Sequence, residues 1–344
     1  MIDLIVAGGG PVGLGTAILA ARAGMAVTVV EPRAAPVDKA CGEGLMPAAV
    51  RALRGLGIEP SGRPFHGIRY VDGPHRVEGR FRAGPGLGVR RTTLHASLGE
   101  QAALAGIPIL TGRVDTIRQS GEWVEAAGLR ARYLVAADGL HSPVRQRLDL
   151  TVPAAGAGPS AADGRYGLRR HFQVEPWSDL VEVHWGADAE AYVTPVGDDL
   201  VGVAVLFRGR GDFGSWLSGF PELAERLSGA PAATGVRGAG PLRQRARRLV
   251  AGRVLLVGDA AGYLDAITGE GISVGLRCAA ELVRCVEADR PQAYTRAWRR
   301  TTRDYRLMTG ALLWASGQPP LRRRLVPTAE RLPWLFTAAV NQVA

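Results

Sequence analysis

The chain has 344 residues, 47% of them apolar, and is therefore long enough to bury a large core. Of its 42 basic residues, 41 are arginines spread through every segment, and no basic, aromatic-interleaved motif accompanies the net charge of +10, which argues against nucleic-acid binding. No charge-free apolar stretch reaches the length of about eighteen residues that predicts a membrane span. Three cysteines without metal spacing, six scattered histidines and an initial apolar run that reads as a strand predict a reduced, cytoplasmic chain without a metal site.

The first predicted elements form a βαβ unit with a glycine-rich turn. The apolar run IDLIVA leads into GGGPVG, followed by a helical pattern and a second strand over residues 27–30. In such a turn Gly8 permits the tight bend, Gly10 lets the backbone approach a pyrophosphate, and Gly13 lets the helix pack closely on the sheet. The helix N-terminus then faces the phosphates. The pattern predicts a dinucleotide site; a tight turn without a ligand is the alternative.

An acidic residue follows this unit at the distance typical of nucleotide sites. Glu31 lies eighteen residues beyond Gly13, where its carboxylate can accept hydrogen bonds from both ribose hydroxyls of an adenosine. Its negative charge excludes a 2′-phosphate. We expect Arg33 to reach the adenosine or the pyrophosphate from the side.

The next segment combines a cysteine–glycine loop, DKACGEGLMP over residues 38–47, with short elements. Cys41 has two open interpretations: a thiol that touches the site, with a pKa lowered by Lys39 and by loop N–H groups, or a small apolar residue that packs the loop. A helix over PAAVRALRGLGI follows. The stretch HGIRYVDGPHRVEGRFRAGPGLGV predicts two strands that enter a second sheet, and a helix is expected over residues 93–105.

Two further strands end in acidic–glycine motifs. A strand over residues 133–137 ends at Asp138-Gly139, and one over residues 254–257 ends at Gly258-Asp259 and continues through TGEGI into a helix. Because parallel strands bring their carboxyl ends to one edge of a sheet, all three glycine-containing motifs should meet at one crevice. Between the two late motifs, YGLRRHFQV, VEVHWG, EAYVTPVG and DLVGVAVLF alternate like the strands of an antiparallel sheet.

These three motifs resemble those of FAD-dependent oxidoreductases with the p-hydroxybenzoate hydroxylase fold, over roughly residues 1–290. That superfamily includes aromatic-ring hydroxylases, geranylgeranyl reductases and flavin-dependent halogenases. GDAAGY with TGEGI, and the cysteine–glycine loop, resemble the reductase and halogenase branch. The absence of a W-x-W motif and the presence of a single lysine, Lys39, disfavour a halogenase.

The resemblance implies an α/β fold with a discontinuous Rossmann-like FAD-binding domain, an inserted antiparallel-sheet substrate domain and a C-terminal helical layer. The FAD-binding domain is expected over residues 1–66, 90–158 and 244–295, the substrate domain over residues 67–89 and 159–243, and the helical layer over residues 296–344.

The resemblance also implies FAD as the cofactor and NAD(P)H as a transient reductant. Asp259 would hydrogen-bond the ribityl chain, Asp138 and Gly139 would support the pyrophosphate region, Arg91 would contact the phosphate or ribityl side, and Val114 would lie on a strand beside the adenine.

The glycines of TGEGI would place N–H groups against the pyrimidine end of the flavin, where a helix N-terminus stabilises the anionic reduced form. The predicted cofactor-binding residues are Gly8, Gly10, Pro11, Val12, Gly13, Glu31, Pro32, Arg33, Cys41, Gly42, Arg91, Val114, Asp138, Gly139, Gly258, Asp259, Gly269, Gly271 and Ile272.

The substrate side is predicted from the inserted sheet. Leu45, Tyr192, Pro195 and Trp185 are the expected substrate contacts, in a largely apolar pocket. Because the flavin would carry the chemistry, the side-chain candidates for catalysis are limited to Cys41 and Tyr192.

Two reactions, monooxygenation and reduction of a double bond, fit this pattern. Both need the same FAD geometry, and they differ in the shape of the substrate pocket and in the access of oxygen to the flavin. The short chain and compact insertion favour an NAD(P)H-dependent monooxygenase that oxidises a small apolar, aromatic or polyketide-like biosynthetic substrate with O2. The alternatives are a geranylgeranyl-reductase-like reductase of a double bond and a non-redox FAD-dependent cyclase. The cluster Arg322 to Arg324, set among bulky apolar residues, predicts either contact with a membrane or carrier protein, or a helical layer over the FAD-binding domain.

Overall fold

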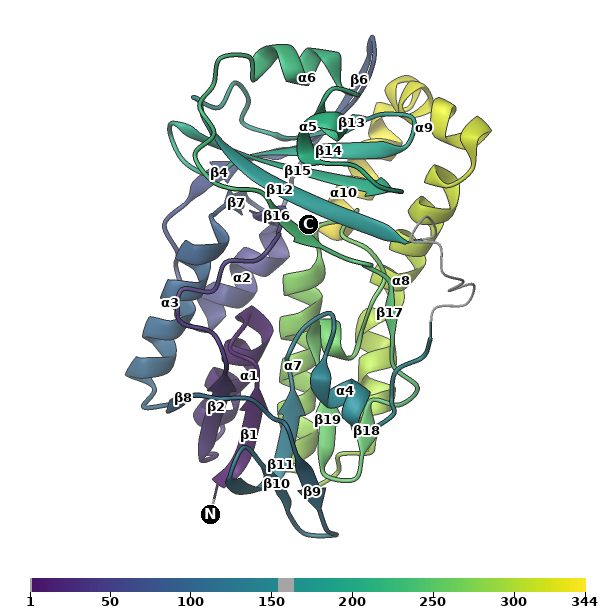
Figure 1. The fold of residues 1–344 in the computed structure, drawn as a ribbon. Coiled ribbons are helices and arrows are strands. Elements are labelled where there is room, and N and C mark those ends of the chain that lie inside the picture. Colours follow the sequence, from purple (N-terminus) through teal and green to yellow (C-terminus); the bar gives the residue numbers. More distant parts are fainter. Residues whose placement is uncertain (1, 154–163) are drawn as a thin grey trace.

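The computed structural model describes residues 2–153 and 164–344, which form two large sheets with helices around them (Figure 1). The helices are α1 (Pro11–Arg22), α2 (Pro47–Gly55), α3 (Arg91–Leu104), α4 (Pro143–Arg147), α5 (Phe213–Leu217), α6 (Pro221–Arg226), α7 (Gly271–Glu287), α8 (Ala293–Ser316), α9 (Pro319–Arg331) and α10 (Pro333–Val343).

The first sheet has eight strands, and its parallel centre runs β19, β11, β1, β2, β8. The strands of this sheet are β1 (Ile2–Ala7), β2 (Val27–Glu31), β8 (Ile109–Thr111), β9 (Ile117–Gln119), β10 (Val124–Ala126), β11 (Leu129–Ala136), β18 (Val250–Ala251) and β19 (Val254–Leu256). The apolar runs of the central strands β1, β2, β11 and β19 are largely buried, and α1 packs on β1 and β2. The predicted strands at residues 27–30, 133–137 and 254–257 are therefore confirmed to within a few residues, and all three glycine-containing motifs follow carboxyl ends of neighbouring strands.

The second sheet has seven strands in the order β16, β12, β15, β14, β13, β5, β6, and only the β13–β5 pair is parallel. Its strands are β5 (Gly67–Asp72), β6 (His75–Arg80), β12 (Arg165–Gln173), β13 (Val181–Trp185), β14 (Ala189–Pro195), β15 (Leu200–Arg208) and β16 (Arg237–Ala239). The shorter pairings join β3 (Gly44–Leu45), β7 (Gly86–Gly88) and β4 (Arg63–Phe65), and separately β17 (Gln244–Arg245) and β20 (Gly262–Tyr263). A largely antiparallel wall drawn from two separate segments matches the predicted inserted sheet.

The chain enters the first sheet, leaves for the second and returns, so the Rossmann-like layer is discontinuous, as expected. The predicted boundaries of the domains stay predictions. The boundary between residues 158 and 159 lies outside the described residues.

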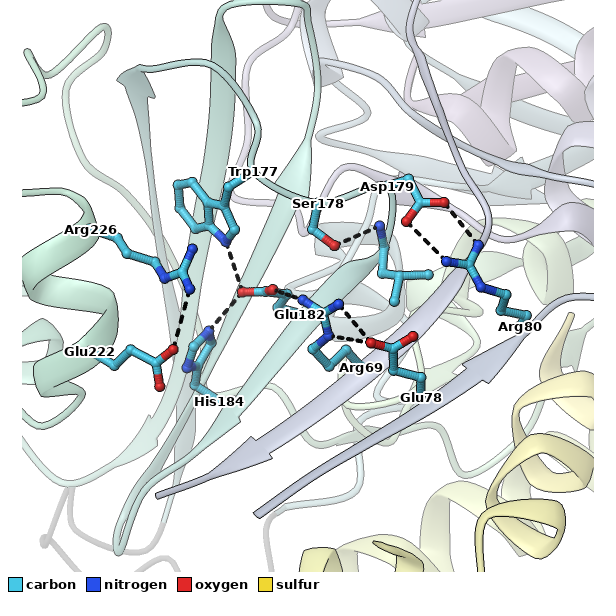
Figure 2. Close-up of polar contacts among 11 residues, drawn as sticks. Arg69, Glu78, Arg80, Trp177, Ser178, Asp179, Glu182, His184, Glu222 and Arg226 are labelled. Carbon is cyan, nitrogen blue, oxygen red and sulfur yellow. Dashed lines mark hydrogen bonds and ion pairs between the residues drawn. The ribbon is translucent and has the colours of Figure 1, made fainter. Parts of the chain in front are cut away.

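A polar network covers one face of the second sheet (Figure 2). Glu182 accepts hydrogen bonds from Arg69, from the Trp177 indole and from His184, and Arg69 also pairs with Glu78. Burial opposes ionisation of Glu182, but the three donors lower its pKa to about 2. His184 therefore belongs to a structural network on the face opposite Val181 and Val183.

The C-terminal helices differ from the predicted layer over the FAD-binding domain. Only α8 packs on α7, whereas α9 packs on β5 and β6 and α10 packs on β6. Phe336 and Val340 of α10 are buried against Val77 and Val183, so the apolar edge of the second sheet decides where these helices settle. Within residues 2–153 and 164–344, no helix is long and apolar enough to cross a bilayer.

A buried cluster of four charges joins the second sheet to the rest of the molecule. Arg165 Nη2 lies 2.9 Å from Glu190 Oε2, and Arg165 Nε lies 2.8 Å from Asp265 Oδ2 in the segment before TGEGI. Arg322 of α9 approaches Glu190 Oε1 at 3.0 Å and also donates to the carbonyls of Gly186 and Ala189. Arg322 is thus a structural clamp, which corrects its predicted role in a basic docking segment.

The charge cluster predicts a large stability loss in Glu190→Gln. The substitution leaves two buried guanidinium groups facing one carboxylate, and breaking a buried pair costs about 3 kcal/mol or more. Chemical denaturation should show that decrease in the free energy of unfolding. Glu125→Gln, which breaks the exposed pair with Arg130, should cost less than about 1 kcal/mol. Equal losses in the two variants would contradict the analysis.

Candidate functional site

One cavity of about 1320 Å³ lies between the carboxyl ends of the first sheet, the second sheet and the C-terminal helices. This volume exceeds the range of about 300–1,000 Å³ that is usual for a single ligand. The cavity therefore has room for a large cofactor together with a second molecule.

Of the nineteen residues predicted to bind the cofactor, all except Gly13 line this cavity. Gly13 is buried behind the turn, where an added Cβ would come within 1.9 Å of the Gly8 carbonyl oxygen. Gly13 thus has the packing role expected of it. Whether each lining residue contacts a cofactor stays a prediction.

The glycine turn leaves an open helix N-terminus at the cavity. Gly8 has φ +104° and a Cβ there would lie 2.5 Å from the Ala137 carbonyl oxygen, so no other residue fits without displacing backbone. Gly10 is the N-cap of α1, and the helix has neither a capping side chain nor an acidic residue in its first turn. Its free N–H groups are therefore available to an anion.

Glu31 ends β2 at the cavity wall and is held from two sides. Its Oε2 accepts the Gly9 N–H at 2.8 Å, and its Oε1 lies 2.6 Å from Arg33 Nε. Burial opposes ionisation, but these donors together lower the pKa of Glu31. Arg33 pairs with Glu31 itself, and its expected contact with the adenosine or the pyrophosphate stays a prediction.

Arg145 connects the second and third motifs. It is fully buried, and its guanidinium donates to the Ala260 carbonyl at 2.9 Å and to the Leu140 carbonyl at 2.8 Å. Ser142 accepts the Arg145 N–H and begins α4. The DGxxSxxR spacing therefore fixes the two loops relative to each other.

Several polar atoms at the cavity have no partner in the described protein. Asp138 Oδ1 and Arg91 Nε are buried without a hydrogen bond, and no described residue donates to the Asp259 carboxylate. Buried polar groups normally have partners, so these atoms indicate a polar ligand. A free helix N-terminus, an acid at the end of β2 and these unpartnered groups fit FAD, whose pyrophosphate, ribose and ribityl hydroxyls need such donors and acceptors.

The third motif presents a second helix N-terminus to the cavity. Gly269 has φ +69°, a left-handed conformation that favours glycine, and α7 begins at Gly271. Gly269, Gly271 and Ile272 all line the cavity. This placement agrees with the predicted position at the pyrimidine end of a flavin. Val114 also lines the cavity, but it lies in a loop after β8 instead of on a strand.

The cysteine–glycine loop is anchored on the second sheet. Glu43 accepts the Arg91 N–H at 2.8 Å through Oε1, and its Oε2 forms a hydrogen bond with buried His171. Asp38 pairs with Arg169 and Arg237. The loop therefore keeps Cys41 at the cavity wall.

Burial raises the pKa of the Cys41 thiol, outweighing the nearby Arg91 charge. Of the two interpretations left open for Cys41, this result contradicts the thiol with a lowered pKa. Lys39, which the sequence interpretation set aside, lines the same part of the cavity with Nζ beside Gly139. The sequence did offer a signal for placing Lys39 in the site, because this single lysine lies two residues before Cys41.

The predicted substrate residues divide into two groups. Leu45 and Tyr192 line the cavity, and the Tyr192 hydroxyl donates to the Ile267 carbonyl at 3.3 Å. Trp185 is buried beneath the wall, against Tyr70 and under Arg322, and does not line the cavity. Pro195 also lies outside it, because its carbonyl packs against Gly88. Alternation along β13 and β14 did not reveal which face α9 would cover.

The sequence interpretation missed the contribution of the C-terminal helices. Eleven residues of α8, α9 and α10 line the far end of the cavity, and only Thr328 among them is polar. They are Met308, Leu312, Leu325, Thr328, Ala329, Leu332, Leu335, Phe336, Ala339, Val340 and Val343. Their apolar spacing was visible in the sequence, but it did not say which sheet they would face.

Comparison with known proteins agrees with this site. An FAD binding domain model matches residues 1–80 and 87–163. The chain is 29% identical over 316 residues to a menaquinone reductase of Mycolicibacterium smegmatis, covering 82% of this chain and 76% of that protein. It is 27% identical to digeranylgeranylglycerophospholipid reductase 1 of Methanothermobacter thermautotrophicus, covering 80% and 74%. It is 26% identical to an aurachin C monooxygenase/isomerase of Stigmatella aurantiaca, covering 86% and 84%.

Solved structures share the fold at low sequence identity. The flavin-dependent brominase Bmp2 superimposes with a TM-score of 0.83 at 17% identity, covering 99% of this chain and 93% of that one. The flavin-dependent halogenase CmlS gives 0.76 at 18% identity, and the match covers 89% of this chain but only 62% of CmlS.

Asp259→Ala is predicted to weaken FAD binding. A charge-assisted hydrogen bond to a ribityl hydroxyl contributes enough that its loss should raise the Kd at least about tenfold. The apoprotein should not lose stability, because no described residue donates to this carboxylate and burial raises its pKa. Titration followed by flavin fluorescence measures the Kd. Asp304→Ala, at an exposed position on α8, is the control, and equal affinities would contradict the assignment.

Glu270 is predicted to make stability pH-dependent. Burial raises its pKa to about 7, with Arg277 and the Thr268 hydroxyl offsetting only part, and its Oε2 has no hydrogen-bond partner. A raised carboxyl pKa means that the folded state binds the proton more tightly, so stability falls as pH rises from about 4.5 to about 7.

Glu270→Gln should therefore stabilise the apoprotein by about 3 kcal/mol at pH 8 and by less than about 1 kcal/mol at pH 5. Denaturation at both pH values measures the difference. Glu287→Gln, exposed at the other end of α7, should show no such difference. A pH-independent effect of Glu270→Gln would refute the argument.

Proposed function

We propose that this chain, an FAD-dependent oxidoreductase of the p-hydroxybenzoate hydroxylase-fold superfamily, reduces a carbon–carbon double bond in an elongated apolar substrate, with NAD(P)H as the electron source. FAD, when bound, supplies the two-electron chemistry. The observation that carries the proposal is the apolar far end of the cavity, which continues from the TGEGI turn to α9 and α10.

The shape and lining of this compartment favour a hydrocarbon chain over a compact ring. Leu312, Leu325 and Phe336 line the cavity together with Val181 and Val183 of β13. Apolar walls of this extent offer dispersion and hydrophobic contacts along a chain but almost no hydrogen bonds to orient a polar ring. The reductase names of two relatives point to the same substrate class.

Reduction of a double bond adds a hydride to one carbon and a proton to the other. Cys41 is our candidate for the proton source. Its thiol is kept neutral by burial, lines the cavity, and accepts only the Glu43 N–H at 3.4 Å. Tyr192 is a weaker candidate, because its hydroxyl already donates to the Ile267 carbonyl.

Monooxygenation remains the second candidate, because a relative named as a monooxygenase/isomerase matches 86% of the chain. That reaction was the one that the short chain favoured in the sequence. The apolar compartment contributed by α8 to α10 enlarges the pocket beyond the compact insertion on which that preference rested, and so supports the reductase.

The deciding experiment is anaerobic turnover of FAD-loaded protein with NADH or NADPH and a menaquinone that carries a polyprenyl tail. We expect a product that is formed without oxygen and that, after reoxidation of any quinol in air, is still heavier by two hydrogens because a double bond of the tail has been saturated. A product that contains one added oxygen atom, and forms only in air, would replace this proposal with monooxygenation.

A matched pair of variants tests the compartment. Ala338 and Ala339 are neighbouring exposed residues of α10, and only Ala339 lines the cavity. Ala339→Trp should fill the far end and lower kcat/KM for the long substrate at least about tenfold, while Ala338→Trp leaves it unchanged. NAD(P)H-driven flavin reduction without substrate should be equal in both.

A further inference from the structure

The corner formed by the end of α8, by α9 and by the start of α10 carries most of the exposed bulky apolar side chains. Of ten such residues in the described chain, six lie between Leu307 and Leu335. They are Leu307, Trp314, Leu321, Leu332, Trp334 and Leu335, and we name them the corner residues. Trp314 is 64% exposed and Trp334 is 68% exposed.

These helices are neighbours, so the corner residues share one region of the molecule. Helix α8 packs on α9 and α9 packs on α10 (Figure 1). Met308 of α8 and Leu332, the residue between α9 and α10, both line the cavity, so the three helices border the same space. Exposed apolar groups gathered in this way indicate an interaction surface.

Arginines surround this surface. Residues 293–344 contain nine arginines and two acidic residues, so this segment supplies most of the net charge of +10 of the whole chain. Arg323 and Arg324 are exposed on α9, while Arg322 is tied to Gly186 and Glu190. One of the two acids, Glu330, is already paired with His75. The partner surface must therefore be negatively charged as well as able to accept apolar side chains.

The cavity wall continues onto this surface. Leu332 and Leu335 both line the cavity, yet they are 38% and 50% exposed. An apolar wall that reaches the outside between tryptophans and arginines is an arrangement suited to the interface of a lipid layer, where aromatic rings and arginine side chains combine apolar bodies with polar tips.

We propose that the corner residues, with Arg323 and Arg324, dock the protein onto an anionic lipid bilayer. The helices lie on the bilayer without crossing it, consistent with the finding that none of the described helices is suited to span one. Charge complementarity favours anionic lipid over a second copy of this chain, because two such arginine-rich surfaces repel each other. The docking does not depend on which reaction the flavin site performs.

The test is flotation of the full chain, loaded with FAD, with vesicles of phosphatidylcholine alone or with phosphatidylglycerol at three parts in ten. We expect flotation with the anionic vesicles and little with the neutral ones, and loss of binding at high salt. Vesicles that contain brominated lipid should quench tryptophan fluorescence, because Trp314 and Trp334 enter the layer.

Two double variants separate the contributions. Trp314→Ser with Trp334→Ser, and Arg323→Glu with Arg324→Glu, should each reduce the partition coefficient at least about tenfold, and the first should also abolish quenching. The matched control is Arg208→Glu with Arg210→Glu, an exposed arginine pair at the end of β15 and just beyond it, which should stay within about twofold. Unchanged FAD content and thermal unfolding show that each variant is folded.

Absence of flotation with anionic vesicles would overturn the proposal. Flotation that both double variants retain would do the same. A wild-type dimer that the tryptophan double variant converts to a monomer, seen by light scattering, would assign the surface to a second copy of the chain. Binding to an acidic carrier protein without any binding to vesicles would assign it to that partner.

Discussion

The guanidinium of Arg145 holds the cofactor side of this protein together. It is fully buried and donates to the backbone carbonyls of Leu140, Asp259 and Ala260, and to Gln244. Burying a guanidinium is costly unless it is hydrogen-bonded, and although Nε has no partner, the other bonds tie the accepting loops to one another. The parallel sheet brings Asp138 and Asp259 to one cavity, and Arg145 fixes the loops that carry them.

Buried ionic contacts perform a similar task between the two sheets. Arg165 bridges from β12 to Asp265, just before the turn that begins α7, and Glu43 reaches from the cysteine–glycine loop to His171 on the same strand. Because such groups are stable in the interior only when paired, the distance between the flavin-side loops and the second sheet has little freedom. The cavity between them is therefore a built space with two chemically different ends.

That difference between the two ends links structure to reaction class. Near the glycine turns, the wall presents N–H groups, carboxylates and Arg91, as an anionic cofactor requires. Toward α9 and α10 the wall is almost entirely apolar, and its surface continuation carries Trp314, Trp334 and exposed arginines. A hydrophobic substrate that resides in a lipid layer would meet the protein at the end where it is least costly to bury.

The sequence by itself determined the cofactor half. Three glycine-containing motifs at the ends of apolar strands were enough to predict the cofactor site, because a parallel sheet brings those strand ends to one edge. Gly8 and Gly13 are part of this signal, because a Cβ at either position would collide with backbone atoms. The fold class and the antiparallel second wall followed from strand periodicity in the same way.

Only the tertiary structure decided the substrate half. Alternation along β13 identifies two faces but cannot say that Trp185 lies beneath α9 while Tyr192 faces the cavity. Likewise, the sequence pattern of α9 shows an apolar face but does not show that this face packs on the second sheet. It also does not show that Arg322 pairs with Glu190 while Arg323 and Arg324 are exposed to solvent. Such choices depend on packing between segments far apart in the chain, and local sequence carries no information about those partners.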